Sequence, residues 1–127
     1  MSEFHAVVWL DHFTASVFHF NTHNAEKQVI ISERSERLHL KGRVIGTGRQ
    51  TVDHAYYQNI TKALQGAKEI LVIGPATAKL ELMRHILQHD KALSRCIAGQ
   101  KTVGKISDRG ILAYAKKYFK AYDRMTG

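Results

Sequence analysis

Several features that would assign this chain of 127 residues to a particular class of protein are scarce or missing. It has one cysteine, Cys96, and therefore no internal disulfide, and a lone thiol in a short apolar run is typical of a buried structural side chain. No apolar run approaches the roughly 20 residues that cross a bilayer. The first residues lack the basic and apolar regions of a secretory signal. These absences predict a cytoplasmic protein that does not associate with membranes.

What the chain does have is an excess of positive charge, and this charge is concentrated in two segments. The formal net charge is +8. Residues 34–49 carry five basic side chains and one acidic one, and residues 101–127 carry seven and two, so the two segments contribute +4 and +5. The rest of the chain comes to −1. Charge gathered in this way favours a polyanionic partner such as nucleic acid, and a solvated basic face is the alternative.

The first third of the chain has the β-branched and aromatic composition of extended strands. We expect three strands in an antiparallel meander and a short fourth strand, at residues 5–10, 15–20, 28–32 and 37–40. Residues 41–50 then form a glycine-bearing loop. We interpret Asp11, which follows the first strand, as a turn residue and not as a ligand of a two-metal nuclease site, because no second carboxylate lies close to it in the sequence.

From Thr51 the apolar residues recur at helical spacing. We expect a helix over residues 51–65 with Thr51 as its N-cap and Gly66 at its end, then an apolar strand at 69–73. Gly74 and Pro75 lead into a second helix, whose buried residues should be Leu80, Met83, Ile86 and Leu87. A strand at 94–98 and a helix at 108–122 complete the chain. This order predicts an α/β fold: a mixed sheet with an antiparallel N-terminal meander and flanking helices.

Residues 70–79, Ile-Leu-Val-Ile-Gly-Pro-Ala-Thr-Ala-Lys, carry a family resemblance. They are similar to the strand, Gly-Pro turn and lysine-bearing helix start in the middle domain of the archaeo-eukaryotic release factors and Pelota. The order of elements resembles that domain over almost the whole chain. The resemblance implies one RNase H-like domain over residues 1–127, a stand-alone bacterial relative that works in translation.

In the release factors, the loop before the long helix carries a Gly-Gly-Gln motif that enters the peptidyl transferase centre of the ribosome. This chain has Gly46-Thr47-Gly48-Arg49-Gln50 in the matching place. Thr47 and Arg49 displace Gln50 from the glycines, and a displacement of about 1 Å costs on the order of a hundredfold in rate where catalysis rests on positioning. Gln50 is therefore the catalytic residue only if the protein hydrolyses peptidyl-tRNA. We expect a loop that binds RNA and leave this hydrolase activity as the alternative.

The expected RNA contacts are basic side chains and close-approaching glycine amides, because phosphates supply most of the affinity for RNA. They are Arg37, Lys41, Arg43, Gly46, Gly48, Arg49, Lys101, Lys105, Arg109, Lys116 and Lys120. Gly74 and Lys79 form a candidate anion-binding turn at a helix N-terminus, with close helix–sheet packing as the alternative. The expected partner is the ribosome or tRNA. A third hypothesis is a non-catalytic interaction domain that forms a homodimer along an open sheet edge.

Histidines and tyrosines offer further candidates. His85 and His89 lie four residues apart on one helix, a spacing that suits a metal, but no Glu or Cys accompanies them in a known pattern. We therefore expect partly exposed helix histidines, no metal and no cofactor. Five tyrosines could stack on bases; at their helical spacing only Tyr57 and Tyr114 are expected to be free to do so.

Overall fold

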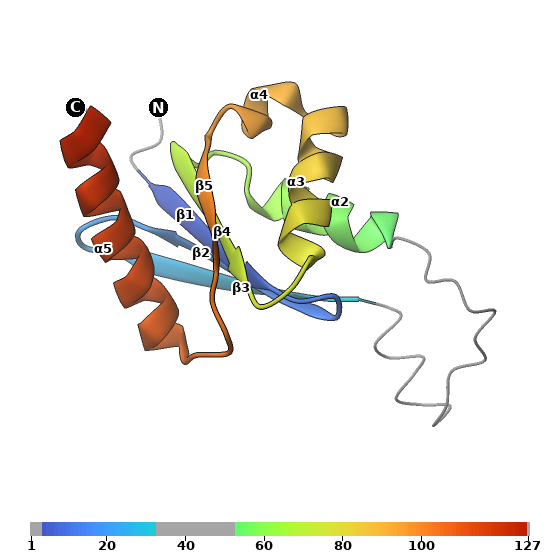
Figure 1. Cartoon of the computed structure of the whole chain (residues 1–127), viewed down its shortest axis with the longest axis horizontal. Helices are drawn as coiled ribbons and strands as arrows, with labels where there is room; N and C mark the ends of the chain where they lie inside the picture. Colours follow the sequence, from blue (N-terminus) through green and yellow to red (C-terminus); the bar gives the residue numbers. More distant parts are fainter. Residues whose placement is uncertain (1–3, 33–52, 127) are drawn as a thin grey trace.

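A five-stranded sheet runs through the protein, with helices on both of its faces (Figure 1). The computed structural model describes residues 4–32 and 53–126, with side chains up to residue 121. In chain order the elements are β1 (His5–Leu10), β2 (Thr14–Phe20), β3 (Ala25–Ile31), α2 (His54–Ala63), β4 (Glu69–Gly74), α3 (Ala78–His89), α4 (Lys91–Ser94), β5 (Ile97–Thr102) and α5 (Asp108–Thr126). None of the described helices is long and apolar enough to cross a membrane.

The strand order is β3-β2-β1-β4-β5, so β1 lies at the centre. β1 pairs antiparallel with β2, with His5 opposite Phe20, and parallel with β4, with Val7 opposite Leu71. β3 extends the antiparallel half and β5 extends the parallel half. The predicted α/β class, with an antiparallel meander, a mixed sheet and flanking helices, is therefore confirmed.

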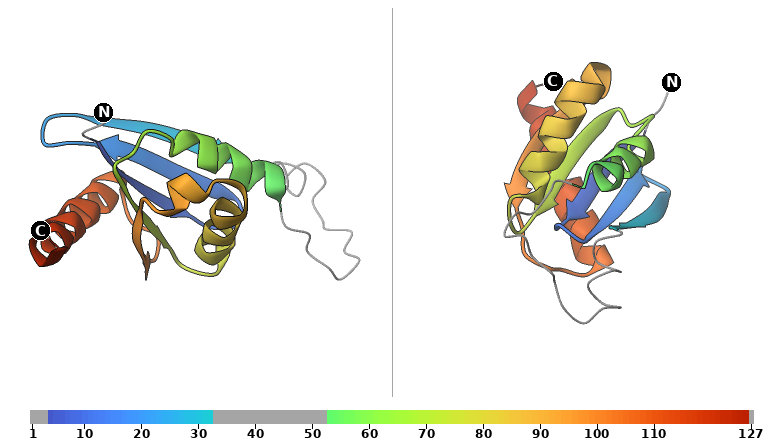
Figure 2. Two further views of the ribbon diagram at one scale, coloured as in Figure 1. Left: turned by 90° about the horizontal axis from the view of Figure 1, so that it is seen from above. Right: turned by 90° about the vertical axis from the view of Figure 1, so that its right-hand side faces the viewer.

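The two faces of the sheet are covered by different helices (Figures 1 and 2). Alternate residues of β1 point to opposite faces, as the two-residue period of a strand requires. Val8 and Leu10 join the core under α2 and α3, whereas Val7 and Trp9 join the core under α5. Both faces of β1 are thus buried from residue 6 to residue 10, which explains why its sequence is continuously apolar there instead of alternating.

The long helix after residue 52 begins slightly later than predicted. Its N-cap is Asp53 and not Thr51: a carboxylate oxygen of Asp53 accepts a hydrogen bond of 3.0 Å from the backbone N–H of Tyr56. A charged acceptor at the N-cap also interacts favourably with the helix dipole. The helix ends as expected just before Gly66, which has a left-handed φ of +88°.

The predicted buried face of α3 is wrong at two positions. Leu80 and Leu87 are 46% and 56% exposed, and only Ile86 of the predicted set is fully buried. Ala78 and Leu82 are buried with Ile86, so the stripe that faces the sheet repeats every four residues from Ala78. The prediction was wrong because large apolar side chains also lie on the exposed side of this helix, so that the sequence does not single out one apolar face.

The strand predicted at 94–98 is also misplaced. One turn of helix, α4, occupies residues 91–94 because Asp90 caps it: its carboxylate accepts a hydrogen bond of 3.0 Å from the backbone N–H of Leu93. β5 begins at Ile97 instead. Cys96 lies between the two elements and is half-buried, so the expectation of a fully buried thiol is not met.

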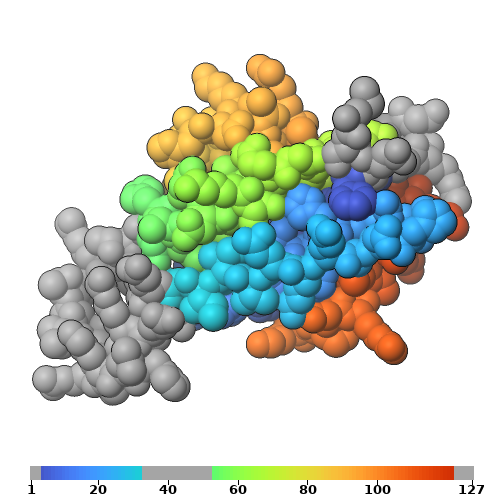
Figure 3. Space-filling view, turned by 180° about the vertical axis from the view of Figure 1, so that it is seen from behind, coloured from blue at the N-terminus to red at the C-terminus, as the bar shows by residue number. Residues whose placement is uncertain are grey.

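The helix predicted at 108–122 begins at Asp108 as expected and continues to Thr126. Ile111, Ala115 and Phe119 are buried against the sheet, in agreement with the predicted inner face. At the other side of the molecule, β3 forms an open edge of the sheet (Figure 3). Every residue of β3 except Ile30 is exposed.

Candidate nucleic-acid interface

The carboxyl end of β1 is fixed by hydrogen bonds from a tight turn. The carboxylate of Asp11 accepts bonds of 2.8 Å from the backbone N–H groups of Phe13 and Thr14. This is the geometry of a turn residue, as predicted. Among the described residues no group of three or more His, Cys, Asp or Glu side chains is arranged to hold a metal ion.

The two ends of segment 33–52 are joined at this turn. The hydroxyl of Ser32 donates a hydrogen bond of 2.6 Å to Asp53, and the backbone N–H of Ser32 donates one of 2.8 Å to the carbonyl of Phe13. The hydroxyl of Tyr56 donates a hydrogen bond of 2.9 Å to the backbone carbonyl of Asp11. Burial raises the pKa of this hydroxyl, and the nearby charge of Asp11 raises it further. The segment therefore leaves and re-enters the described fold beside the end of β1. Its predicted site residues, which lie outside the described residues, are Arg37, Lys41, Arg43, Gly46, Gly48, Arg49 and Gln50.

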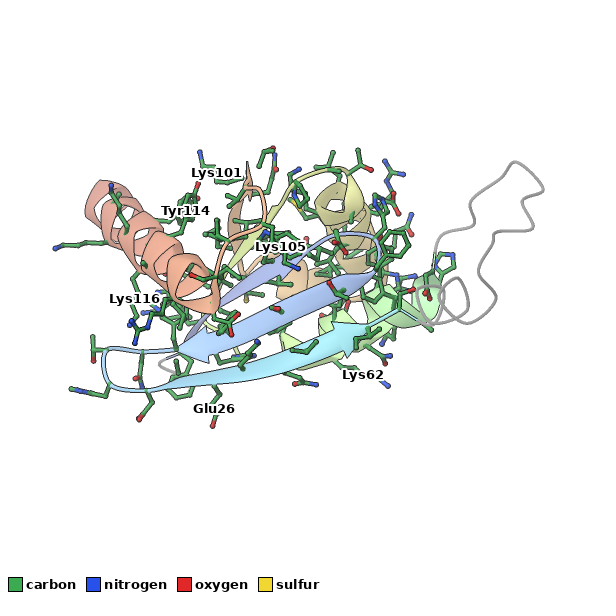
Figure 4. All side chains as sticks on the ribbon, turned by 90° about the horizontal axis from the view of Figure 1, so that it is seen from below. Glu26, Lys62, Lys101, Lys105, Tyr114 and Lys116 are labelled. Carbon is green, nitrogen blue, oxygen red and sulfur yellow. The ribbon has the colours of Figure 1, made fainter. Side chains whose placement is uncertain are left out.

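Three of the predicted basic contacts lie at or after the end of β5, and we call them the carboxyl-end group: Lys101 within β5, and Lys105 and Arg109 after it. All three are exposed. The indole N–H of Trp9 donates a hydrogen bond of 3.0 Å to the carbonyl of Gly104. This bond fixes the chain next to Lys105 against the carboxyl end of β1. The Lys105 ammonium lies 6.0 Å from the centroid of the Trp9 ring, in a cation–π arrangement over β1 (Figure 4).

The positive charges of the carboxyl-end group are not neutralised by carboxylates in the described part of the fold. Asp108, which precedes Arg109, instead pairs with Lys27 of β3 at 2.7 Å. No carboxylate of the described residues forms an ion pair with Lys101, Lys105 or Arg109. Lys101, opposite Ile73 of β4, and Lys105, over Trp9, thus present two cations without a described carboxylate partner at the carboxyl end of the parallel strands.

Lys116 and Lys120, which we call the α5 pair, lie elsewhere. They are exposed on the C-terminal half of α5, beside the turn between β2 and β3 (Figure 4). That turn is at the amino end of β1, since His5 is opposite Phe20. The structure therefore divides the predicted basic residues of the last segment between the two ends of the sheet.

The Gly-Pro turn is used for packing. A Cβ atom added at Gly74 would overlap the carbonyl oxygen of Leu10 on the adjacent strand, so glycine allows β4 and β1 to approach closely here. Lys79 is 6% exposed, and its ammonium donates a hydrogen bond to the carbonyl of Ala76. The ammonium group is thus already hydrogen-bonded to the backbone of the turn.

The aromatic candidates also differ from the prediction. Tyr57 is 2% exposed and its hydroxyl donates a hydrogen bond of 3.0 Å to Glu81, so the expectation that it is free to stack on a base is wrong. Tyr114 is half-buried and packs against the core beneath α5. Neither side chain stands out from the surface as a stacking platform.

Of the two helix histidines, His89 is exposed, in line with the prediction, whereas His85 is more buried than predicted. His85 is 6% exposed, and its ring centroid lies 4.3 Å from that of His89 and 6.2 Å from that of His54. Its Nε2 atom is 2.9 Å from the amide oxygen of Gln58. Burial lowers the pKa of His85, and the neighbouring His89 and His54 lower it further.

Sequence reasoning missed the residues that surround the α5 pair. His5, Asn21 and Thr22 line a cavity together with Lys116 and Lys120. They belong to three segments that are far apart in the sequence and meet only through strand pairing and the docking of α5. No local pattern could have indicated that they share a site.

Comparisons with known proteins agree with the fold. No protein-family model matches the chain, and no curated protein matches it in sequence. Among solved structures, Pelota from Archaeoglobus fulgidus superposes with a TM-score of 0.64 over 92% of this chain at 12% identity, and Pelota from Thermoplasma acidophilum with 0.61 over 86% at 18%. Dom34 from S. cerevisiae, described as a translation termination-like factor that interacts with Hbs1, gives 0.57 over 95% at 18%.

The match concerns one part of each of these longer proteins. This chain spans 32%, 30% and 37% of the three solved chains, or about a third of each. At these identities the similarity establishes the fold and leaves the activity open. The resemblance that the Gly-Pro segment and the order of elements indicated is thereby confirmed, and the chain has the fold of a Pelota-like, release-factor-like domain.

Proposed function

We propose that this protein is a translation-associated RNA-binding protein that contacts the ribosome or tRNA through segment 34–49 and the basic residues of segment 101–127. The observation that supports the proposal is that Lys101 and Lys105 lie at the same end of the sheet as Ser32 and Asp53, the residues that flank segment 33–52. The solved structures with the same fold include a translation termination-like factor, which makes a translational RNA the first choice of polyanion.

The carboxyl-end group suits phosphate contacts. Lys101 and Lys105 are exposed and are not ion-paired within the described fold. A phosphate that approaches them displaces only water and counterions, and it breaks no internal ion pair. Release of those counterions supplies sequence-independent affinity. Segment 34–49 has a net charge of +4, and the residues that flank it, Ser32 and Asp53, lie at the same end of the sheet.

A salt titration tests the proposal. Binding of the purified protein to ribosomes and to bulk tRNA would be measured between low and high ionic strength. If several phosphates are contacted, the affinity falls steeply, and the slope of log K against log salt changes by about 0.7 to 0.9 for each contact removed. The variant Lys101→Gln/Lys105→Gln should therefore lower the slope by about 1.4 to 1.8.

Lys62→Gln/Lys91→Gln is the matched control. It removes the same charge from exposed lysines of α2 and α4, on the other face of the sheet. We expect this control to keep the wild-type slope. Binding that is absent, independent of salt, or weakened equally by both variants would refute the proposal. Capture of a protein partner that survives nuclease treatment would instead support the interaction-domain hypothesis.

A further inference from the structure

A cavity lies at the amino end of the sheet, away from Lys101 and Lys105. It has a volume of about 480 Å³ and opens between the C-terminal half of α5, the first residue of β1 and the turn between β2 and β3. Its lining residues are His5, Phe20, Asn21, Thr22, Lys116, Phe119 and Lys120. Pockets of roughly 300–1,000 Å³ are the usual size for small-molecule sites.

Packed rings form the floor of this cavity. The ring of His5 lies 4.5 Å from that of Phe119 and 6.1 Å from that of Phe20, measured between centroids. Phe20 and Phe119 are themselves 6.1 Å apart. The Nε2 atom of His5 is 2.8 Å from a carboxylate oxygen of Glu69, which fixes the orientation of the imidazole. The floor is therefore aromatic, with its three rings tilted against one another and the imidazole held by Glu69.

The α5 pair makes the rim of the cavity cationic. Lys116 and Lys120 are four residues apart, on adjacent turns of one helix face, where like charges repel each other. Neither ammonium forms an ion pair with a described carboxylate, and no acidic residue of the described part of the chain lines the cavity. An anion bound between the two lysines would remove their repulsion, so the rim favours a phosphate-sized anion.

The opposite wall supplies neutral hydrogen-bonding groups. The side-chain oxygen of Asn21 accepts bonds of 2.8 and 2.7 Å from the backbone N–H groups of His23 and Asn24, which fixes the turn. This leaves the amide NH₂ group of Asn21 without a partner among the described residues, next to the hydroxyl of Thr22. Donors and acceptors at this position suit the polar edge of a base or a ribose hydroxyl.

We propose that this cavity binds one nucleotide of single-stranded RNA, with its phosphate between Lys116 and Lys120 and its base or ribose against the aromatic floor. A paired helix would not fit, because its bases are stacked inside and only an unstacked nucleotide can enter a pocket. This inference rests on the proposed RNA-binding function and adds to it a second contact, at the other end of the sheet.

Amide chemical shifts of the isotope-labelled full chain test the site directly. AMP, adenosine and inorganic phosphate would be titrated separately. We expect AMP to produce saturable shifts at Thr22, Lys116 and Lys120, with smaller shifts from phosphate and from adenosine. No shifts at these residues would overturn the proposal. Phosphate acting as strongly as AMP would overturn the assignment of a nucleotide.

Two double variants separate the cavity from the carboxyl-end group. Lys116→Gln/Lys120→Gln should abolish the AMP shifts and, because it removes one phosphate contact, lower the salt slope for a single-stranded oligonucleotide by about 0.7. Lys101→Gln/Lys105→Gln should leave the AMP shifts unchanged. If AMP shifts also vanish in the second variant, the cavity is not the site and the inference fails.

The same experiments distinguish the inference from the proposed function. AMP-induced shifts at the cavity in a protein that binds neither ribosomes nor tRNA would refute the proposed function and would reduce the cavity to a free-nucleotide site. Salt-dependent ribosome binding with no AMP shifts would support the proposed function and refute the inference.

Discussion

The substitution Gly74→Ala provides a sharp test of how the Gly-Pro turn works. The added methyl group would overlap the carbonyl oxygen of Leu10, which belongs to the backbone of the central strand and cannot rotate away. One of two paired strands must therefore move, and overpacking of this kind costs about 1–3 kcal/mol. For a domain of this size that corresponds to a fall in Tm of roughly 3–6 °C per kcal/mol.

Two other glycines provide matched controls. A Cβ atom at Gly104 would meet nothing within 4 Å, and Gly104 does not have a left-handed φ, so Gly104→Ala should leave the free energy of unfolding unchanged or raise it by up to about 1 kcal/mol. Gly66→Ala meets no atom either, but its φ of +88° should cost about 1 kcal/mol or more.

Urea denaturation followed by circular dichroism measures all three variants. A Gly74→Ala protein that is as stable as Gly104→Ala would refute the packing argument. If Gly74→Ala kept its stability and lost affinity for tRNA, the turn would be an anion site, as the alternative interpretation of Gly74 and Lys79 holds.

Three further predictions concern single side chains. Tyr57→Phe should lower the free energy of unfolding by about 1–2 kcal/mol, because it removes a hydrogen bond to a carboxylate. Tyr114→Phe should not lower it, because the Tyr114 hydroxyl makes no hydrogen bond within the described residues. Urea denaturation measures both variants. The pKa of His85 is lower in the folded state than its ordinary value of 6.5, so the unfolded chain binds more protons and stability should fall as the pH drops below about 6.5. His89→Gln removes a group that lowers this pKa and should make the fall shallower in thermal melts recorded from pH 8 to 5; an unchanged profile would contradict this. Gln50→Ala should leave ribosome binding unchanged, and a loss of peptide release from stalled complexes in this variant would establish the hydrolase alternative.

The sequence predicted the elements of the fold best where a long stretch repeats one period. Strand β1 has five consecutive apolar residues after His5, and α5 repeats apolar residues at Ile111, Ala115 and Phe119, so both were located correctly. The boundaries of the helices were harder to predict from the sequence. Asp53 and Asp90 each cap a helix through a bond to a backbone N–H three residues later, and local hydrogen bonds of this kind decide boundaries that hydrophobic periodicity does not.

The site was predictable in its charge and not in its arrangement. The positions of Lys101 and Lys116 in a basic segment were evident from the sequence, but their separation to opposite ends of the sheet depends on how α5 crosses it. The burial of Tyr57 also depends on a partner, Glu81, that lies on another helix. Sequence periodicity describes one element at a time, and these features arise between elements.

The central position of β1 has a consequence for the order in which the protein folds as it is made. β1 is synthesised first, and β2 can pair with it at once, but its other neighbour, β4, begins only at Glu69. The face that carries Val7 and Trp9 stays uncovered until α5, the last element, has emerged. A nascent chain arrested before α5 would therefore expose an apolar sheet face to chaperones or to other nascent chains.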